Sequence, residues 1–228
     1  MAKLKNIPQH LGIILDGNRR WAKEKKLPAF EGHRKGLEKV KELIKWCQSR
    51  GVKVLTLFVF STENWKRKKS EVSFLMKLVQ KAITDNLREL QKQGIKVRAI
   101  GQMEKLSKPI QASIVEAERL TKDNKGMVVN FALSYGGRAE IVEAFKRIIE
   151  KKIPPDKITE DIVSQNLWTS DLDLIIRTGK EQRLSNFLIW QAAYSELYFC
   201  PKYWPNFSEQ DLDSAFTEYI HRQRRFGK

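Results

Sequence analysis

Polar and charged residues follow short apolar segments at several points in the chain, and these residues are the best candidates for chemistry. Asp16 ends the apolar run 11–15, and the Gly-Asn-Arg-Arg segment 17–20 follows it directly. A carboxylate can bind a divalent cation, and guanidinium groups bind phosphate oxygens. An alternative is that Asp16 only caps a helix, because aspartate is among the commonest N-cap residues.

Two further polar clusters have the same position relative to an apolar segment. Ser61 to Arg67 follows the run 52–60, and an Arg-Thr-Gly segment at 177–179 follows the run 172–176. The carboxyl ends of parallel strands meet at one edge of a sheet, where ligands bind in open α/β folds. We therefore expect one cleft with carboxylates, arginines and small polar groups, which suits a diphosphate and a divalent cation.

Apolar runs and helical spacings alternate along the chain, as is typical of an α/β fold with a parallel sheet. The sequence predicts a single domain over residues 1–228, with a mainly parallel six-stranded sheet and helices on both faces. Segment 61–69 is predicted to be a loop, and segment 186–194 is ambiguous between helix and strand. The predicted strands are 11–15, 52–60, 95–100, 127–134, 172–176 and 197–199; the helices are 31–50, 71–93, 107–122, 138–152 and 160–167, with two more beginning at 19 and 208.

Composition limits the possible partners and setting. The net charge of +16 favours acidic partners, which include nucleic acid, a phosphorylated small molecule and an anionic membrane surface. Two cysteines indicate neither a disulfide framework nor a cysteine-based zinc site. Residues 1–9 are short and polar, and no run reaches the ~20 apolar residues of a membrane span, so we expect a cytoplasmic protein.

The common nucleotide-binding and hydrolase motifs are absent from the sequence. It contains no G-x-x-x-x-G-K-[ST], no G-x-G-x-x-G and no G-x-S-x-G. A basic RNA- or DNA-binding protein is the alternative that the charge suggests. No RNP, KH, helix-turn-helix or zinc-finger pattern supports that alternative, and no nucleic-acid partner is expected.

Ordered blocks along nearly the whole chain resemble the cis-prenyltransferases, the family of the bacterial undecaprenyl diphosphate synthases. The blocks are DGNRRWA at 16–22, EGH at 31–33, FSTENW at 60–65, YGGR at 135–138, LIIRTG at 174–179, RLSNFL at 183–188, ELYF at 196–199 and WP at 204–205. The resemblance implies sequential cis condensation of isopentenyl diphosphate onto an allylic diphosphate, usually farnesyl diphosphate. The implied product is undecaprenyl diphosphate, the lipid carrier precursor for cell-wall glycan synthesis.

The resemblance also implies the cofactor, the assembly and the roles of individual residues. It implies Mg²⁺, a homodimer and an apolar tunnel for the growing chain. Asp16 and Asn64 match catalytic positions, and Asp16 and Glu196 match metal positions, with Glu196 near the dimer interface. Substrate-binding positions match Gly17, Asn18, Arg19, Arg20, Trp21, His33, Ser61, Thr62, Glu63, Trp65, Arg67, Arg177, Arg183, Leu184 and Ser185.

Three residues depart from the usual family pattern. Ala29 stands where many relatives have an arginine, Lys180 where a second glycine is usual, and Gln182 where a histidine is usual.

The apolar stripe of the predicted helix 71–93 is open to two interpretations, tunnel wall or ordinary core. That stripe includes Leu75, Met76, Val79 and Ile83. The basic run 222–225 is a candidate for peripheral contact with an anionic membrane, at the inner face of the plasma membrane.

Overall fold

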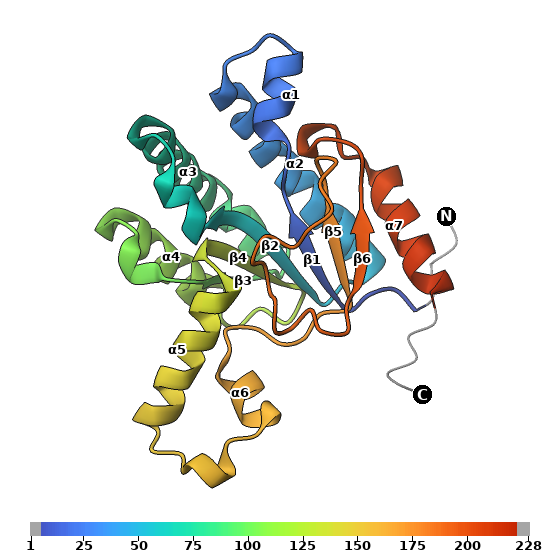
Figure 1. Ribbon diagram of the computed structural model, residues 1–228. Helices are drawn as coiled ribbons and strands as arrows, with labels where there is room; N and C mark the ends of the chain where they lie inside the picture. The colour runs from blue at the N-terminus through green and yellow to red at the C-terminus, as the bar shows by residue number, and fades with distance from the viewer. Residues whose placement is uncertain (1–5, 223–228) are drawn as a thin grey trace.

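A parallel β-sheet forms the centre of the structure, a computed structural model that describes residues 6–222 (Figure 1). In the described part of the chain the sheet has six strands in the order β3-β4-β2-β1-β5-β6. Every pair of neighbouring strands is parallel, which confirms the predicted sheet. The strands are β1 (His10–Ile14), β2 (Val54–Ser61), β3 (Lys96–Ile100), β4 (Val128–Tyr135), β5 (Leu174–Arg177) and β6 (Glu196–Phe199).

The helices connect these strands, and their starts and ends lie within two residues of the predicted ones. The α-helices are α1 (Asn18–Glu24), α2 (Ala29–Arg50), α3 (Lys69–Lys92), α4 (Lys108–Thr121), α5 (Gly137–Glu150), α6 (Glu160–Asn166) and α7 (Glu209–His221). Short 3₁₀ turns are η1 (Thr62–Lys66), η2 (Met103–Lys105), η3 (Pro155–Lys157) and η4 (Trp204–Asn206). None of the helices in residues 6–222 has the length and apolar content that a bilayer crossing needs.

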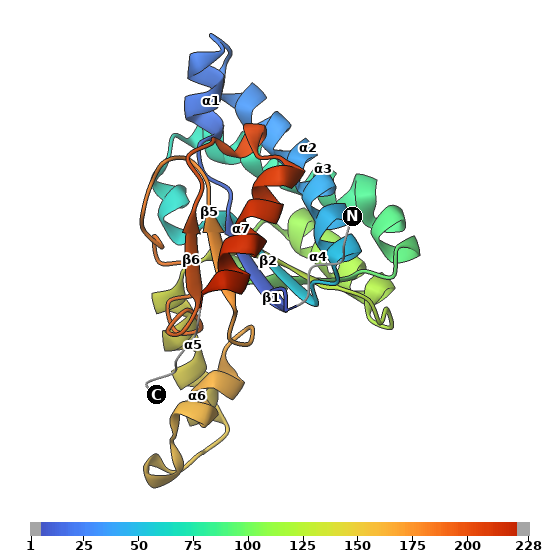
Figure 2. The same ribbon diagram turned by 90° about the vertical axis from the view of Figure 1, so that its right-hand side faces the viewer.

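One face of the sheet is covered by helices. Leu11 and Ile13 of β1 pack there with buried residues of α2, such as Leu43, and of α7, such as Phe216. Further along this face, α3 and α4 cover β3 and β4 (Figures 1 and 2). Because alternate residues of a strand point to opposite faces, Gly12 and Ile14 of β1 face the other side of the sheet.

The other face is covered mainly by irregular chain, which differs from the prediction of helices on both faces. Ile14 and Ile175 pack there against Phe187 and Leu188, which lie in a series of turns and bends. The ambiguous segment 186–194 is therefore neither helix nor strand. Helices α5 and α6 pack on each other and project from the body of the molecule (Figure 2). The predicted loop 61–69 contains the 3₁₀ turn η1.

Trp204 joins three parts of the chain behind the C-terminal edge of the sheet. Its indole is fully buried, stacks on Phe207 and donates a hydrogen bond to the Gly36 carbonyl of α2 at 2.7 Å. Its main-chain N–H donates to the Asp16 carbonyl at 2.9 Å. The turn after β1 is thus held against α2 by a residue from the C-terminal quarter of the chain.

Trp204→Phe should lower the free energy of unfolding by about 2 kcal/mol, because the Gly36 carbonyl is left buried without its donor. Trp46→Phe is the matched control on α2, since Trp46 is half-buried and contacts Lys39 through its ring face. We expect less than about 1 kcal/mol there. Urea denaturation of the three proteins measures both values, and equal losses would contradict the role given to the Trp204 indole.

Candidate functional site

The turn that follows β1 carries Asp16 to the C-terminal edge of the sheet. The Asp16 N–H donates to the Thr178 hydroxyl oxygen at 3.0 Å, and that hydroxyl donates to the Asp16 carbonyl at 2.8 Å. Gly17 follows with a φ of 103°, and a Cβ at this position would lie 2.6 Å from a ring carbon of Tyr203. The main chain of the turn is therefore fixed on both sides, which sets the direction of the Asp16 side chain.

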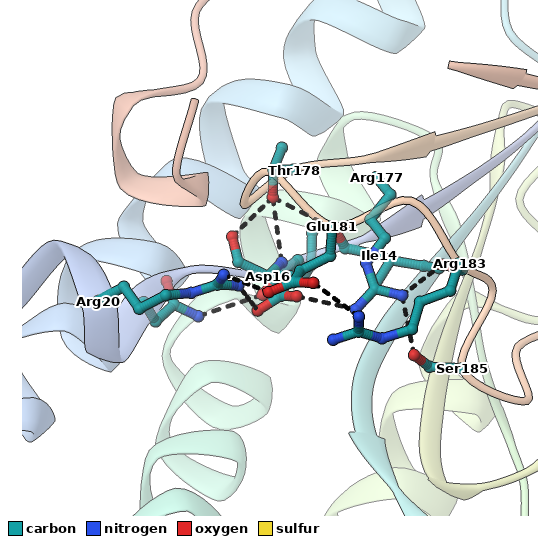
Figure 3. A network of polar contacts seen from close by, with 10 residues as sticks. Ile14, Asp16, Arg20, Arg177, Thr178, Glu181, Arg183 and Ser185 are labelled. Atoms are coloured by element: carbon teal, nitrogen blue, oxygen red, sulfur yellow. Dashed lines mark hydrogen bonds and ion pairs between the residues drawn. The ribbon is translucent and has the colours of Figure 1, made fainter. Parts of the chain in front are cut away.

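The Asp16 carboxylate lies between two guanidinium groups (Figure 3). Arg177 Nη2 donates to one oxygen and Arg20 Nη2 to the other, each at 2.9 Å. Burial raises the pKa of Asp16, but the hydrogen bonds from Arg177 and Arg20 outweigh burial and hold this pKa below its ordinary value. Asp16 is therefore ionised at neutral pH and available to a cation.

A second carboxylate extends this network to the loop that follows β5. Glu181 accepts from Arg20 Nη1 at 2.7 Å and from Arg183 Nη1 at 2.6 Å. Arg177 also donates to the Ser185 hydroxyl at 2.8 Å and to the Arg183 carbonyl. Five residues predicted to form one site, from opposite ends of the sequence, are thus brought together (Figure 3): Asp16, Arg20, Arg177, Arg183 and Ser185.

A polar cleft of about 570 Å³ opens beside this network. Asn64 and Glu63 reach it from η1, where the Ser61 N–H donates to Asn64 Oδ1 at 3.1 Å. Asn186 donates to Glu63 Oε1 at 3.1 Å. The residues predicted from sequence that line the cleft are Asp16, Asn18, His33, Ser61, Glu63, Asn64, Arg67, Arg177 and Ser185.

A second charged group lies across the cleft and is centred on Glu71 of α3. Its carboxylate is 3.0 Å from Arg67, 3.6 Å from His33 Nε2 and 3.9 Å from Arg19. The pKa of His33 is below its ordinary value, mainly because the side chain is buried and secondly because of the nearby Arg67 charge. His33 is therefore neutral at pH 7, and the positive charge on this side of the cleft comes from the two arginines.

An apolar cavity of about 140 Å³ lies between α2 and α3 and adjoins the polar cleft. Leu75, Val79 and Ile83 of the predicted apolar stripe line it, whereas Met76 packs in the core beside β4. Five residues line both the cavity and the cleft: Leu15, Asn18, His33, Val59 and Leu75. A ligand with a charged head and an apolar tail could therefore occupy both at once.

Several residues predicted to belong to the site lie outside the cleft lining. Trp65 donates to the Ser134 hydroxyl and Trp21 to Asn206, while Leu184 packs in the core of the irregular face. Gly17, Arg19, Arg20, Thr62 and Arg183 surround the cleft without lining it. Glu196 is the first residue of β6, at the opposite end of the sheet from Asp16, and pairs with Arg222 at 2.9 Å.

Two residues of the site, Glu71 and Glu181, escaped the sequence analysis. Thr178 belongs to the polar segment 177–179 that was expected at this edge of the sheet. Glu181 lies between Arg177 and Arg183 in sequence, and an acidic residue between two expected phosphate ligands was the available signal. Glu71 gave a weaker signal, because an acidic residue in the first turn of a helix has an ordinary structural role.

None of the three departures from the family pattern lines the polar cleft. Lys180 has a φ of 67°, a left-handed conformation that explains why glycine suits this position, and its ammonium group lies 5.1 Å from the Tyr203 ring centre. Ala29 is exposed at the start of α2, and Gln182 is exposed beside Glu181.

The donor groups of the cleft fit a divalent cation that is shared with a ligand. Within residues 6–222, His, Cys, Asp and Glu side chains do not gather in threes as a protein-built metal cage would require. Asp16 and Glu63 both face the cleft. Mg²⁺ is commonly held by one or two carboxylates, waters and substrate phosphates. Asp16 would hold such an ion together with phosphate oxygens of the ligand.

Arg20→Gln should raise the pKa of Asp16 towards its ordinary value, because one of the two donors to the carboxylate is lost. NMR titration of the Asp16 carboxyl carbon measures this. Ionised Asp16 stabilises the fold above the ordinary aspartate pKa, and this contribution is lost as the pH falls through the lowered pKa. The variant should thus lose about 1 kcal/mol at pH 7 and less in acid.

Arg19→Gln is the control for this titration, because Arg19 neighbours Arg20 in sequence and faces Glu71. Its Asp16 titration should match that of the unchanged protein. An unshifted Asp16 pKa in Arg20→Gln would show that Arg177 alone controls the carboxylate.

Comparison with known proteins agrees with this geometry. Residues 14–227 match the family model described as "Putative undecaprenyl diphosphate synthase". The chain is 46% identical to an isoprenyl transferase of Ralstonia nicotianae, over 97% of this chain and 88% of that protein. It is 47% identical to an isoprenyl transferase of Streptococcus agalactiae, over 98% of this chain and 94% of that protein.

Solved structures give the same result. Lavandulyl diphosphate synthase from Lavandula x intermedia, in complex with dimethylallyl diphosphate, superimposes with a TM-score of 0.94 at 39% identity, covering 97% of this chain and 99% of that chain. A probable undecaprenyl diphosphate synthase from Campylobacter jejuni gives a TM-score of 0.85 at 36% identity, covering 98% and 100%. The chain belongs to the cis-prenyltransferase family.

Proposed function

We propose that this isoprenyl transferase adds isopentenyl diphosphate units to farnesyl diphosphate, each with a cis double bond, and makes undecaprenyl diphosphate. The observation that carries the proposal is the shared lining of the polar cleft and the apolar cavity. An allylic diphosphate needs an anion site and an apolar site that adjoin each other. The product would serve as a precursor of the lipid carrier for cell-wall glycan synthesis.

The arginines supply the chemistry that the reaction needs at the allylic diphosphate. Negative charge grows on the departing diphosphate as the allylic C–O bond breaks, and preorganised donors stabilise it. Arg20, Arg67 and Arg177 are positioned by carboxylates at 2.9 to 3.0 Å. Removing one such donor typically costs about 3 kcal/mol in the barrier. Bound Mg²⁺, held by Asp16, would add Lewis-acid stabilisation of the same charge.

We assign Asn64 a positioning role. Its Oδ1 already accepts the Ser61 N–H at 3.1 Å, which leaves the amide NH₂ as the group able to contact substrate. An amide is a poor base. A donor in this place can hold a diphosphate group, or the isopentenyl diphosphate that carries the attacking alkene, in position.

The apolar cavity is the proposed tunnel for the growing chain. Val40 and Ile44 on α2 face Val79 and Ile83 on α3 across it, and Phe131 of β4 contributes to its wall. Burial of each added isoprene unit there keeps water away from the carbocation-like carbon. The length of the space that the growing prenyl chain can open between α2 and α3 would set the length of the product.

The projecting helix α5 supports a proposed homodimer. Val142, Phe145 and Ile149 lie on one side of it and are 56%, 44% and 73% exposed. Exposed apolar residues at helical spacing are typical of a protein interface. Glu196 lies far from Asp16 of its own chain, so its proposed metal role requires the Asp16 of a second copy.

Peripheral contact with an anionic membrane is supported by the net charge of +16. Of the basic run proposed for this contact, Arg222 pairs with Glu196 and Glu218, and residues 223–225 lie outside the described part of the chain. We propose a cytoplasmic enzyme that meets the inner face of the plasma membrane to deliver its lipid product.

Incubation with farnesyl diphosphate, labelled isopentenyl diphosphate and Mg²⁺ should yield a ladder that ends at the undecaprenyl product, as sized by chromatography. Asp16→Ala should reduce turnover at least a thousandfold, since it removes the proposed metal ligand and the partner of Arg177. Asp213→Asn is the control, because Asp213 pairs with Arg50 at 2.6 Å away from the cleft. A single short product would contradict the proposed product length. Normal turnover by Asp16→Ala would remove Asp16 from the mechanism.

Val142→Asp combined with Ile149→Asp should convert the dimer to a monomer, because charges would be buried in an apolar interface. Light scattering after size exclusion reports the mass, and the assay above should show the loss of activity. Val115→Asp is the control, since Val115 is 64% exposed on α4. An unchanged mass for the double variant would place the interface elsewhere or exclude a dimer.

A further inference from the structure

Glu181 occupies the place between two of the arginines that are proposed to bind diphosphate. One oxygen of its carboxylate is 2.7 Å from Arg20 and the other is 2.6 Å from Arg183 (Figure 3). The same Arg20 also holds Asp16, and Asp16 holds Arg177. The two carboxylates thus accept hydrogen bonds from Arg20, Arg177 and Arg183 that an anionic ligand would otherwise accept.

We propose that the Glu181 carboxylate competes with anionic ligands for this site. A diphosphate displaces the carboxylate, whereas a single phosphate displaces it poorly. The inference rests on the proposed function, because it concerns selection between ligands at that same site. Glu181 is accordingly a specificity-determining residue that favours diphosphate esters over monophosphate esters and small anions.

The charges of the network explain the selection. Three guanidinium groups face two carboxylates, so the ligand-free cluster carries only one excess positive charge. An incoming anion must replace two short charge-assisted hydrogen bonds, which are among the strongest in proteins. A diphosphate brings more charge and more acceptor oxygens than a phosphate, so it can bind both released arginines and reach Arg177 as well.

The positions of the side chains show which carboxylate can leave. Asp16 is held by its main chain and pairs with Arg177, whose side chain is only 5% exposed. The side chains of Glu181 and Arg183 are 30% and 59% exposed. Glu181 also lies between exposed Lys180 and Gln182 on the loop after β5. Glu181 can therefore turn to solvent once the ligand has replaced its two hydrogen bonds, whereas Asp16 remains to hold the ligand's cation.

Glu181→Gln tests the proposal by removing the competing charge at almost constant side-chain size. Titration calorimetry without metal measures the dissociation constants of inorganic pyrophosphate and inorganic phosphate. We expect phosphate to bind about tenfold more tightly and pyrophosphate about threefold more tightly, as expected when charge-assisted hydrogen bonds no longer compete. The ratio of the two affinities should therefore fall about threefold.

Glu181→Asp and Glu116→Gln are the comparison variants. The shorter aspartate reaches one arginine instead of two, so its affinity ratio should lie between those of Glu181 and glutamine. Glu116 pairs with Arg119 at 2.7 Å on the exposed side of α4, and its replacement should leave both constants unchanged.

Weaker binding of both anions to Glu181→Gln would overturn the proposal, because Glu181 would then help to hold the ligand. An unchanged affinity ratio would overturn it as well. The calorimetry does not depend on turnover. If the affinity ratio shifts but the protein fails to elongate farnesyl diphosphate, the proposed reaction is refuted while the competition by Glu181 stands. In an active enzyme, Glu181→Gln should also increase inhibition by phosphate.

Discussion

The ion pair between Asp16 and Arg177 is the interaction on which the site depends. The Arg177 side chain is almost fully buried, and a buried guanidinium needs a carboxylate close by. The two residues lie 161 positions apart in sequence, yet Ile14 and Arg177 are register partners of neighbouring parallel strands. The pairing of β1 with β5 therefore fixes the pair, and the pair in turn fixes the orientation of Arg20 and the loop that contains Ser185.

The combination of this charged edge with an apolar cavity follows from the arrangement of the two longest helices. Helices α2 and α3 cover the same face of the sheet and leave a gap that side chains such as Ile44 and Val79 line without filling. The gap meets the cleft beside Leu15, directly after β1. A sheet edge lined with arginines and a helical layer that leaves apolar space are thus joined at one strand, and this junction is what an amphipathic substrate requires.

The sequence was informative where the signals are local. Short apolar runs that end in polar clusters predicted the strands and the shared edge, and Asp16, Arg177 and Ser185 meet there as expected. Long-range information was missing. The turns of 186–194 are rich in apolar residues because they cover a sheet face, so their pattern resembled helix or strand. Glu181 was not assigned from its neighbours in sequence, and its contact with Arg20 joins residues 161 positions apart.

The hydrogen bonds that tie the Asp16 main chain to Thr178 and Trp204 have a consequence for biosynthesis. Asp16 reaches its final position only after Thr178 and Trp204 have left the ribosome, because Thr178 is translated 162 residues later and Trp204 later still. Central strand β1 must likewise wait for β5. Contacts of such long sequence separation slow folding and leave hydrophobic surface exposed meanwhile. The nascent protein therefore lacks the assembled edge of the sheet until Trp204 has been translated, and shielding of β1 by a chaperone would be useful during that interval.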